Sequence, residues 1–164
     1  MTRTSLRSLG LASLLAFAPA AFADEKPKLN PSNAPADLLG GYTIVAGEKY
    51  GEKEPAERIE GITVRIAEDA IVVLDKEKKE VYAQTYKIDT KSTPWKITLK
   101  SKITPYKQDT KKDDGESIAQ GLIEKDGDMV RLIYALPGSP PPTEFRTKEK
   151  QLMFVMKIDR KEKK

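Results

Sequence analysis

Three pairs of carboxylates have the residue type and spacing that acid–base chemistry requires: Glu52 with Glu54, Asp113 with Asp114, and Asp126 with Asp128. Each pair lies in a charged segment that also holds a glycine, which is typical of a turn in contact with water. A general acid needs burial to raise its carboxyl pKa, and a turn in water does not provide it. We therefore expect solvated turns at these positions and assign no catalytic residue.

The chain contains no histidine and no cysteine, the side chains on which most nucleophilic and zinc chemistry depends. Ser117 and Ser139 consequently have no histidine to deprotonate them. The segment 109–115 is acidic, but Lys111 stands at the third position of a calcium loop and Asp114 at the position that requires glycine. We expect no metal, no cofactor and no enzymatic activity.

Residues 1–23 have the features of a secretory signal peptide. Arg3 and Arg7 precede the apolar run Leu9–Ala18, and Ala21-Phe22-Ala23 fits the small-x-small cleavage rule. The alternative is an uncleaved membrane anchor, but the run is shorter than the ~20 residues that span a bilayer. We expect cleavage before Asp24 and export to the periplasm or the extracellular space, with no transmembrane segment in the mature chain.

The rest of the chain is expected to form one domain with flexible ends. Residues 24–36 contain three prolines and mixed charge, which indicates a flexible linker. The domain is expected over residues 37–159, followed by a charged tail at 160–164. Removal of the signal peptide lowers the net charge from +4 to +2, because two arginines leave with it. No basic stripe with interleaved aromatic residues remains, so we expect no nucleic-acid partner.

Between Tyr42 and Ile158, apolar residues recur at every second position in short runs, a pattern typical of β-strands. Charged or glycine-containing turns separate the runs, and Asp126-Gly127 is a strong hairpin signal. One helical segment is expected at Pro55–Ile59, with the proline in its first turn. We expect eight strands: Tyr42–Ala46, Ile62–Ile66, Ala70–Leu74, Val81–Ile88, Trp95–Ile103, Ile118–Glu124, Met129–Leu136 and Gln151–Ile158.

Short connections between consecutive strands predict an all-β fold with antiparallel neighbours. Closure into an eight-stranded up-and-down barrel removes the exposed edges of the sheet, whereas the alternative, a two-sheet β-sandwich, keeps them. We therefore expect a barrel with one short helix after its first strand.

Six residues share the apolar phase of their strands and are expected to point into the barrel: Val64, Trp95, Leu132, Tyr134, Phe154 and Met156. They form the candidate lining of a ligand site. The interior of such a barrel is either filled or holds one small apolar ligand, and large apolar residues on nearly every strand favour a filled interior. No inward polar residue stands out as an anchor for the polar group of a ligand.

A resemblance to a known family rests on several segments: Leu39-Gly40-Gly41-Tyr42, Gly61–Val64, Gln84–Asp89, Gly127–Leu132, Pro142–Phe145 and Leu152–Ile158. In this order they resemble the small exported lipocalin-like domains of uncharacterised function found in planctomycete bacteria. The resemblance covers about three-quarters of the chain and implies a lipocalin-like barrel without an established activity. Tyr42 replaces the usual tryptophan and Pro141 stands where arginine is frequent, so no role is carried over at either position.

Together these features predict a secreted, non-enzymatic lipocalin-like domain that binds a small hydrophobic molecule or another component of the cell envelope. The alternative is a protein-interaction module, a scaffold or an inhibitor, that acts through rim loops 107–116 and 137–146. The second loop opens with the proline-rich segment LPGSPPP, which is pre-organised and loses little entropy on docking. We expect the domain to be a monomer.

Overall fold

The computed structural model describes residues 34–101 and 117–159. The predicted signal peptide, most of the linker, rim loop 107–116 and the charged tail lie outside the described residues. In chain order the described elements are the 3-10 helix η1 (Ala36–Leu38), β1 (Gly40–Lys49), β2 (Glu52–Lys53), α1 (Ala56–Ile59), β3 (Thr63–Ile66), β4 (Ala70–Leu74), β5 (Glu80–Asp89), β6 (Trp95–Ser101), β7 (Ser117–Asp126), β8 (Met129–Ala135) and β9 (Gln151–Ile158).

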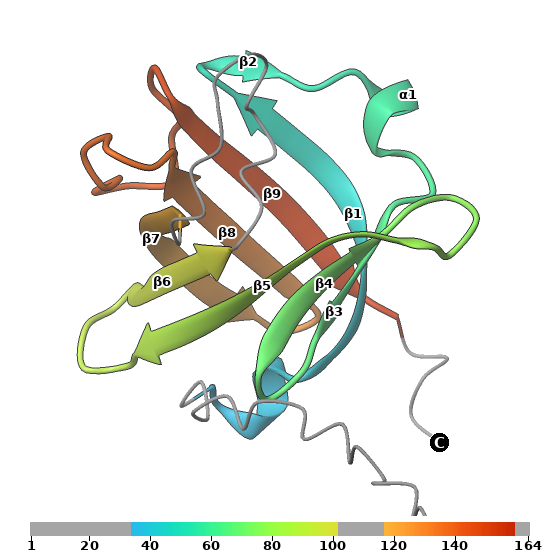
Figure 1. Ribbon diagram of the computed structural model, residues 1–164, viewed down its shortest axis with the longest axis horizontal. Coiled ribbons are helices and arrows are strands. Elements are labelled where there is room, and N and C mark those ends of the chain that lie inside the picture. Colours follow the sequence, from blue (N-terminus) through green and yellow to red (C-terminus); the bar gives the residue numbers. More distant parts are fainter. Residues whose placement is uncertain (1–33, 102–116, 160–164) are drawn as a thin grey trace, which may run out of the picture.

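The strands close into a barrel (Figure 1). From β3 to β9, each strand pairs antiparallel with the next, and β1 pairs with β3 on one side and with β9 on the other. Eight strands, β1 and β3 to β9, therefore complete the ring, while the two-residue β2 pairs only with the end of β1. The predicted eight-stranded antiparallel up-and-down barrel is confirmed, and the two-sheet alternative is not the fold that forms.

Turn chemistry explains why consecutive strands pair. In the β7–β8 hairpin Asp126 pairs with Met129, and the turn residue Gly127 has a φ of 56°, in the left-handed region that glycine adopts without strain. In the β4–β5 turn, the carboxylate of Asp75 accepts hydrogen bonds from the backbone N–H groups of Glu77 and Lys79, at 2.8 and 2.9 Å. The Asp75 side chain thus satisfies polar backbone groups of its turn, and Gly127 permits the tight reversal of the other.

Several details differ from the sequence-based expectation. Neither η1 nor β2 was predicted, and the first strand is longer than Tyr42–Ala46. Its pairing with β9 shifts in register between Ile44 and Ala46, an irregularity that leaves Val45 exposed. Such a bulge bends the strand, and β1 must bend to pair with both of its partners in the closed barrel. The helix begins one residue later than expected, because Pro55 is its N-cap.

The interior is filled at the end of the barrel where η1 lies, at the bottom of Figure 1. We call this end the floor, and its buried side chains include Leu38, Tyr42, Ile66, Ile88, Ile123 and Val130. The Tyr42 hydroxyl donates a hydrogen bond of 2.7 Å to the carbonyl oxygen of Leu38, and Lys125 lies 3.6 Å from Asp37. These contacts fix η1 across the end of the barrel.

The middle of the barrel contains a close approach of two strands at Gly121. This residue of β7 pairs with Ile97 of β6 and with Tyr134 of β8. A Cβ atom at this position would lie 2.0 Å from the carbonyl oxygen of Ile133 and 2.9 Å from the Cα atom of Tyr134. Only glycine is compatible with this backbone geometry.

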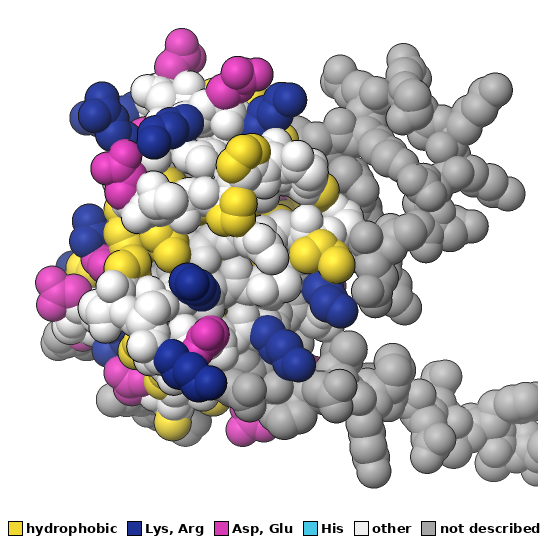
Figure 2. Space-filling view, turned by 90° about the vertical axis from the view of Figure 1, so that its left-hand side faces the viewer, with side chains coloured by type: hydrophobic (Ala, Val, Ile, Leu, Met, Phe, Trp, Pro, Cys, Tyr) yellow, Lys and Arg dark blue, Asp and Glu magenta, His cyan; other side chains and the backbone are white. Residues whose placement is uncertain are grey.

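The outer surface mixes charges of both signs. Figure 2 shows Lys and Arg side chains next to Asp and Glu side chains on one face of the molecule, with apolar side chains scattered between them. Interspersed charge of this kind is typical of a solvated surface rather than of a strong field of one sign.

Candidate functional site

A cavity of about 250 Å³ occupies the opposite end of the barrel interior. We call this end the mouth; β5 and β9 begin there, and α1 lies beside it (Figure 1). Nine apolar side chains line the cavity: Ile44, Ile59, Ile62, Val64, Ile71, Val73, Leu132, Phe154 and Met156. The remaining lining residues are Glu54, Arg58, Tyr82, Gln84 and Tyr134. Part of the interior, which the sequence favoured as filled, is therefore hollow.

Five of the six residues selected from the sequence lie together around this cavity: Val64, Leu132, Tyr134, Phe154 and Met156. Tyr134 and Phe154 face each other across β8 and β9 with their ring centroids 6.4 Å apart, a spacing that suits aromatic packing. Trp95 is not among the described residues that line the cavity. It begins β6 and pairs with Ile123, so it belongs to the floor.

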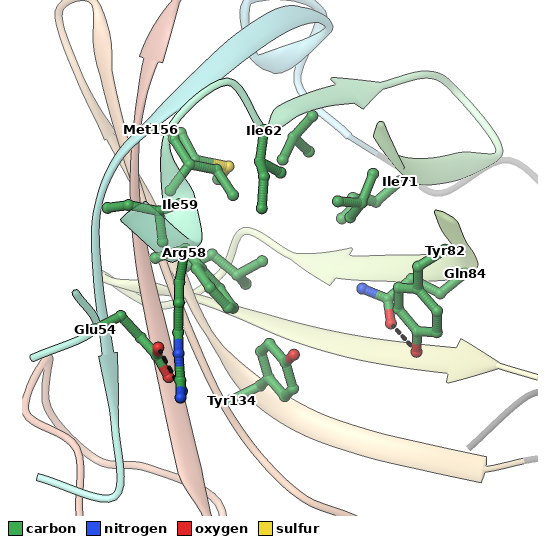
Figure 3. Close-up of a pocket in the computed structure, with 14 residues that line it drawn as sticks. Glu54, Arg58, Ile59, Ile62, Ile71, Tyr82, Gln84, Tyr134 and Met156 are labelled. Atoms are coloured by element: carbon green, nitrogen blue, oxygen red, sulfur yellow. Dashed lines mark hydrogen bonds and ion pairs between the residues drawn. The ribbon is translucent and has the colours of Figure 1, made fainter. Parts of the chain in front are cut away.

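One wall of the cavity carries a polar pair that the sequence reasoning missed. Tyr82 and Gln84 are neighbours on the inner face of β5, and the Tyr82 hydroxyl donates a hydrogen bond of 3.0 Å to Oε1 of Gln84. Figure 3 shows this pair on the side of the cavity opposite Arg58 and Glu54. The expectation that no polar residue stands out on the inner face is therefore wrong. Tyr82 and Gln84 share every second position of β5 with the buried Tyr86 and Ile88, so the alternation in the sequence could have identified both residues.

A second polar pair lies where α1 meets the cavity. Arg58 of α1 forms an ion pair of 3.5 Å with Glu54, which precedes the helix. The Arg58 side chain is 71% exposed and that of Glu54 only 16%, so the guanidinium is mostly in water. Ile59, one residue further, turns an apolar side chain toward the core. Helix α1 thus presents an apolar contact to the interior and an ion pair to the rim.

The other chemical candidates from the sequence do not gather at one place. Glu52 and Asp126 are exposed, and Asp126 lies at the floor end of the barrel, far along β7 from the cavity. The pair Asp113-Asp114 and the segment 109–115 lie outside the described residues. Within 34–101 and 117–159, no three acidic side chains come close enough together to hold a metal ion.

Rim loop 137–146 leaves the mouth at the end of β8 and folds against the outside of the barrel. The Phe145 ring lies under the guanidinium of Arg131, with 4.7 Å between the guanidinium carbon and the ring centroid. Just beyond the loop, Thr147 accepts a hydrogen bond of 2.8 Å from the backbone N–H of Gly51 and donates one to Glu48. The segment is therefore fixed to the β1–β2 turn.

No protein-family model, curated protein or solved structure matches the chain. The likeness to planctomycete lipocalin-like domains consequently stays a prediction. In the part of the chain that the structure describes, no helix is long and apolar enough to cross a membrane.

Proposed function

We propose that this protein is an exported, non-enzymatic binding protein that holds one small hydrophobic molecule inside its barrel. The observation that supports the proposal best is the cavity of about 250 Å³, whose lining is mainly aliphatic and aromatic. Pockets for small molecules typically combine such a lining with a few polar groups that orient the ligand. The Tyr82–Gln84 pair and the Glu54–Arg58 pair match that description.

The volume limits the part of a ligand that the cavity can enclose. An apolar cavity of about 150 Å³ in another protein accepts benzene, so by proportion this cavity accepts a molecule of about ten non-hydrogen atoms. A short alkyl chain, a substituted benzene or a small bicyclic compound has this size. Long-chain lipids are too large to be enclosed.

The alternative, a protein-interaction module, receives less support. Its loop 107–116 lies outside the described residues, and loop 137–146 places Phe145 against Arg131 of the barrel itself. A partner docking on that loop would meet a segment whose largest side chain is already engaged. Export after cleavage between Ala23 and Asp24 belongs to the same proposal and rests on the sequence alone.

Calorimetric titration with an apolar compound of the calculated size tests the binding function, and a matched pair of variants shows where binding occurs. Val73→Phe adds a ring inside the cavity, whereas Val81→Phe adds the same ring on the outer face, where Val81 is 58% exposed. We expect sec-butylbenzene to bind the wild type and Val81→Phe with a stoichiometry near one, and Val73→Phe to lose this binding.

Two results would count against the proposal. If the folded wild type binds neither sec-butylbenzene nor propiophenone, the cavity is not a ligand site and the interaction module becomes the better account. If Val73→Phe and the wild type bind equally well, the compound occupies another place. Circular dichroism of each variant verifies that the barrel is intact.

A further inference from the structure

The side-chain amide of Gln84 brings hydrogen-bond donors to the cavity that no described residue accepts. Gln84 is only 8% exposed, and its Oε1 is occupied by the hydroxyl of Tyr82. Its Nε2, which carries two N–H groups, donates no hydrogen bond to any residue in the described ranges. Figure 3 shows this nitrogen turned toward the space between Ile71 and Tyr134.

The amide nitrogen is accessible from the cavity. Among the described residues, no side-chain nitrogen or oxygen is both enclosed and unpaired. The Nε2 atom of Gln84 must therefore touch open space, and the space on its side of β5 is the cavity that Gln84 lines. A ligand in the cavity takes this donor out of contact with water.

We propose that the ligand carries a neutral hydrogen-bond acceptor, such as a ketone, aldehyde, ester or amide carbonyl, which accepts a hydrogen bond from Nε2 of Gln84. This inference rests on the proposed binding function and names the chemical class of the ligand. A pure hydrocarbon of the same shape would fill the cavity but leave the amide without a partner, which is unfavourable for a buried polar group.

In the structure the amide turns its oxygen toward Tyr82. Tyr82 precedes Gln84 by two positions on the same face of β5, so its hydroxyl reaches Oε1 and leaves Nε2 toward the cavity. The amide therefore presents its N–H groups to the cavity. Ligands that offer only an N–H group gain nothing from it.

The acceptor is neutral because no cation stands beside Gln84 among the described residues that line the cavity. Arg58 lies across the cavity at the rim, where it is 71% exposed and paired with Glu54. An ionised carboxylate placed at Gln84 would lose its hydration with only an amide in return. A neutral carbonyl oxygen loses far less hydration free energy, and one hydrogen bond from the amide compensates for it.

A pair of isosteric compounds tests the proposal directly. Propiophenone and sec-butylbenzene have the same branching of their non-hydrogen atoms and differ at one of them, a carbonyl oxygen in place of a methyl group. Their two dissociation constants are measured by calorimetry for the wild type, for Gln84→Met and for the control Thr85→Val. Methionine keeps the length of glutamine without its amide, and Thr85 points away from the interior on the same strand.

We expect the affinity ratio of propiophenone to sec-butylbenzene to fall about tenfold in Gln84→Met, which corresponds to about 1.4 kcal/mol. Thr85→Val is expected to keep the wild-type ratio. Because sec-butylbenzene needs only an apolar cavity, its unchanged binding to Gln84→Met shows that the variant is folded. Should Gln84→Met fail to fold, Tyr82→Phe, which frees the amide to turn, replaces it and is expected to reduce the ratio.

A second pair of compounds distinguishes the two faces of the amide. Indole offers an N–H donor and indene offers none, and the two have nearly the same shape. If Gln84→Met changes the indole-to-indene ratio and leaves the ketone ratio alone, the amide presents its oxygen and the proposal is wrong. The proposal is equally wrong if both ratios stay constant while the compounds bind, whereas absence of any binding contradicts the proposed function instead.

Discussion

The floor and the mouth of the barrel are built by the same strands but are filled in opposite ways. At the floor, η1 covers the end of the barrel and Leu38 and Tyr42 are sealed in an apolar interior. At the mouth, the inner face holds a cavity and a polar pair, Tyr82 and Gln84. The packed floor is therefore expected to contribute most to stability, and the proposed binding function belongs to the unfilled mouth.

The largest expected effect on stability comes from Gly121, which lies between the floor and the mouth. Gly121→Ala places a Cβ atom against backbone atoms of β8, which have no rotamer by which to move aside. We expect a loss of unfolding free energy of about 4 kcal/mol or more, measured by urea denaturation. A loss below about 1 kcal/mol would mean that β7 and β8 separate easily, and that the two halves are not joined rigidly there.

A substitution in the floor tests whether stability is concentrated there. Leu38→Ala removes a fully buried side chain from η1, and the sealed floor has little freedom to collapse around the gap. We expect a loss of about 3 kcal/mol in the free energy of unfolding. Binding of sec-butylbenzene under native conditions is expected to persist, because the floor residues do not line the cavity. Loss of binding in the folded variant would contradict the division between the two ends.

The floor should also respond to high pH through Tyr42. Burial, then the charge of Asp37 and then Tyr86, raise the pKa of its hydroxyl from 10 to about 12. The folded state keeps this proton longer than the unfolded state, so stability falls as the pH rises from 10 through 12. A tenfold difference in acidity between the two states corresponds to about 1.4 kcal/mol, so we expect a decrease of about 2–3 kcal/mol that Tyr42→Phe lacks.

Urea denaturation of the wild type and of Tyr42→Phe between pH 9 and pH 12 measures how the free energy of unfolding of each depends on pH. Ultraviolet absorbance of tyrosinate provides an independent reading, since one late-titrating tyrosine should be missing from the variant. Parallel stability profiles for the two proteins would show that the hydroxyl of Tyr42 ionises as easily in the fold as in water.

The smallest of these effects is expected at the mouth. Phe154 already borders open space, so Phe154→Ala removes fewer contacts than the same change in a filled core, where it costs about 3–5 kcal/mol. We expect a loss of about 1–2 kcal/mol and an enlarged cavity that accepts longer alkylbenzenes than the wild type. Denaturation and calorimetry measure the two quantities. A loss equal to that of Leu38→Ala would remove the distinction between floor and mouth.

The barrel was predictable because alternation and turn chemistry act locally. Residues such as Ile62, Val64 and Ile66 specify one face by their spacing, and Asp126-Gly127 specifies a reversal. The two-residue β2 and the three-residue η1 are too short to have a period. The bulge after Ile44 arises from the closure of β1 between two partners, which no local pattern contains.

The candidate site was predicted in part, and Trp95 is the predicted lining residue that lies at the other end of the barrel. Alternation tells which face a side chain occupies but not which end of the barrel. The direction of each strand supplies the missing information. Strands β6 and β8 run in the same direction, Trp95 begins β6 and Tyr134 is near the end of β8. The two side chains therefore lie at opposite ends of the barrel. The cavity itself depends on how side chains of six strands and α1 fit together, and that is a property of packing.

The pairing of β1 with β9 has a consequence for the folding of the chain. Tyr42 pairs with Ile158, and Lys49 pairs with Leu152, so the ring is closed by the first and last strands of the barrel. A chain that includes β8 but lacks β9 would form an open sheet with unpaired edges at both sides, and such edges pair readily with other chains. Nearly the whole domain must therefore be available before the barrel can close, and a chain that stops short of Gln151 is expected to aggregate.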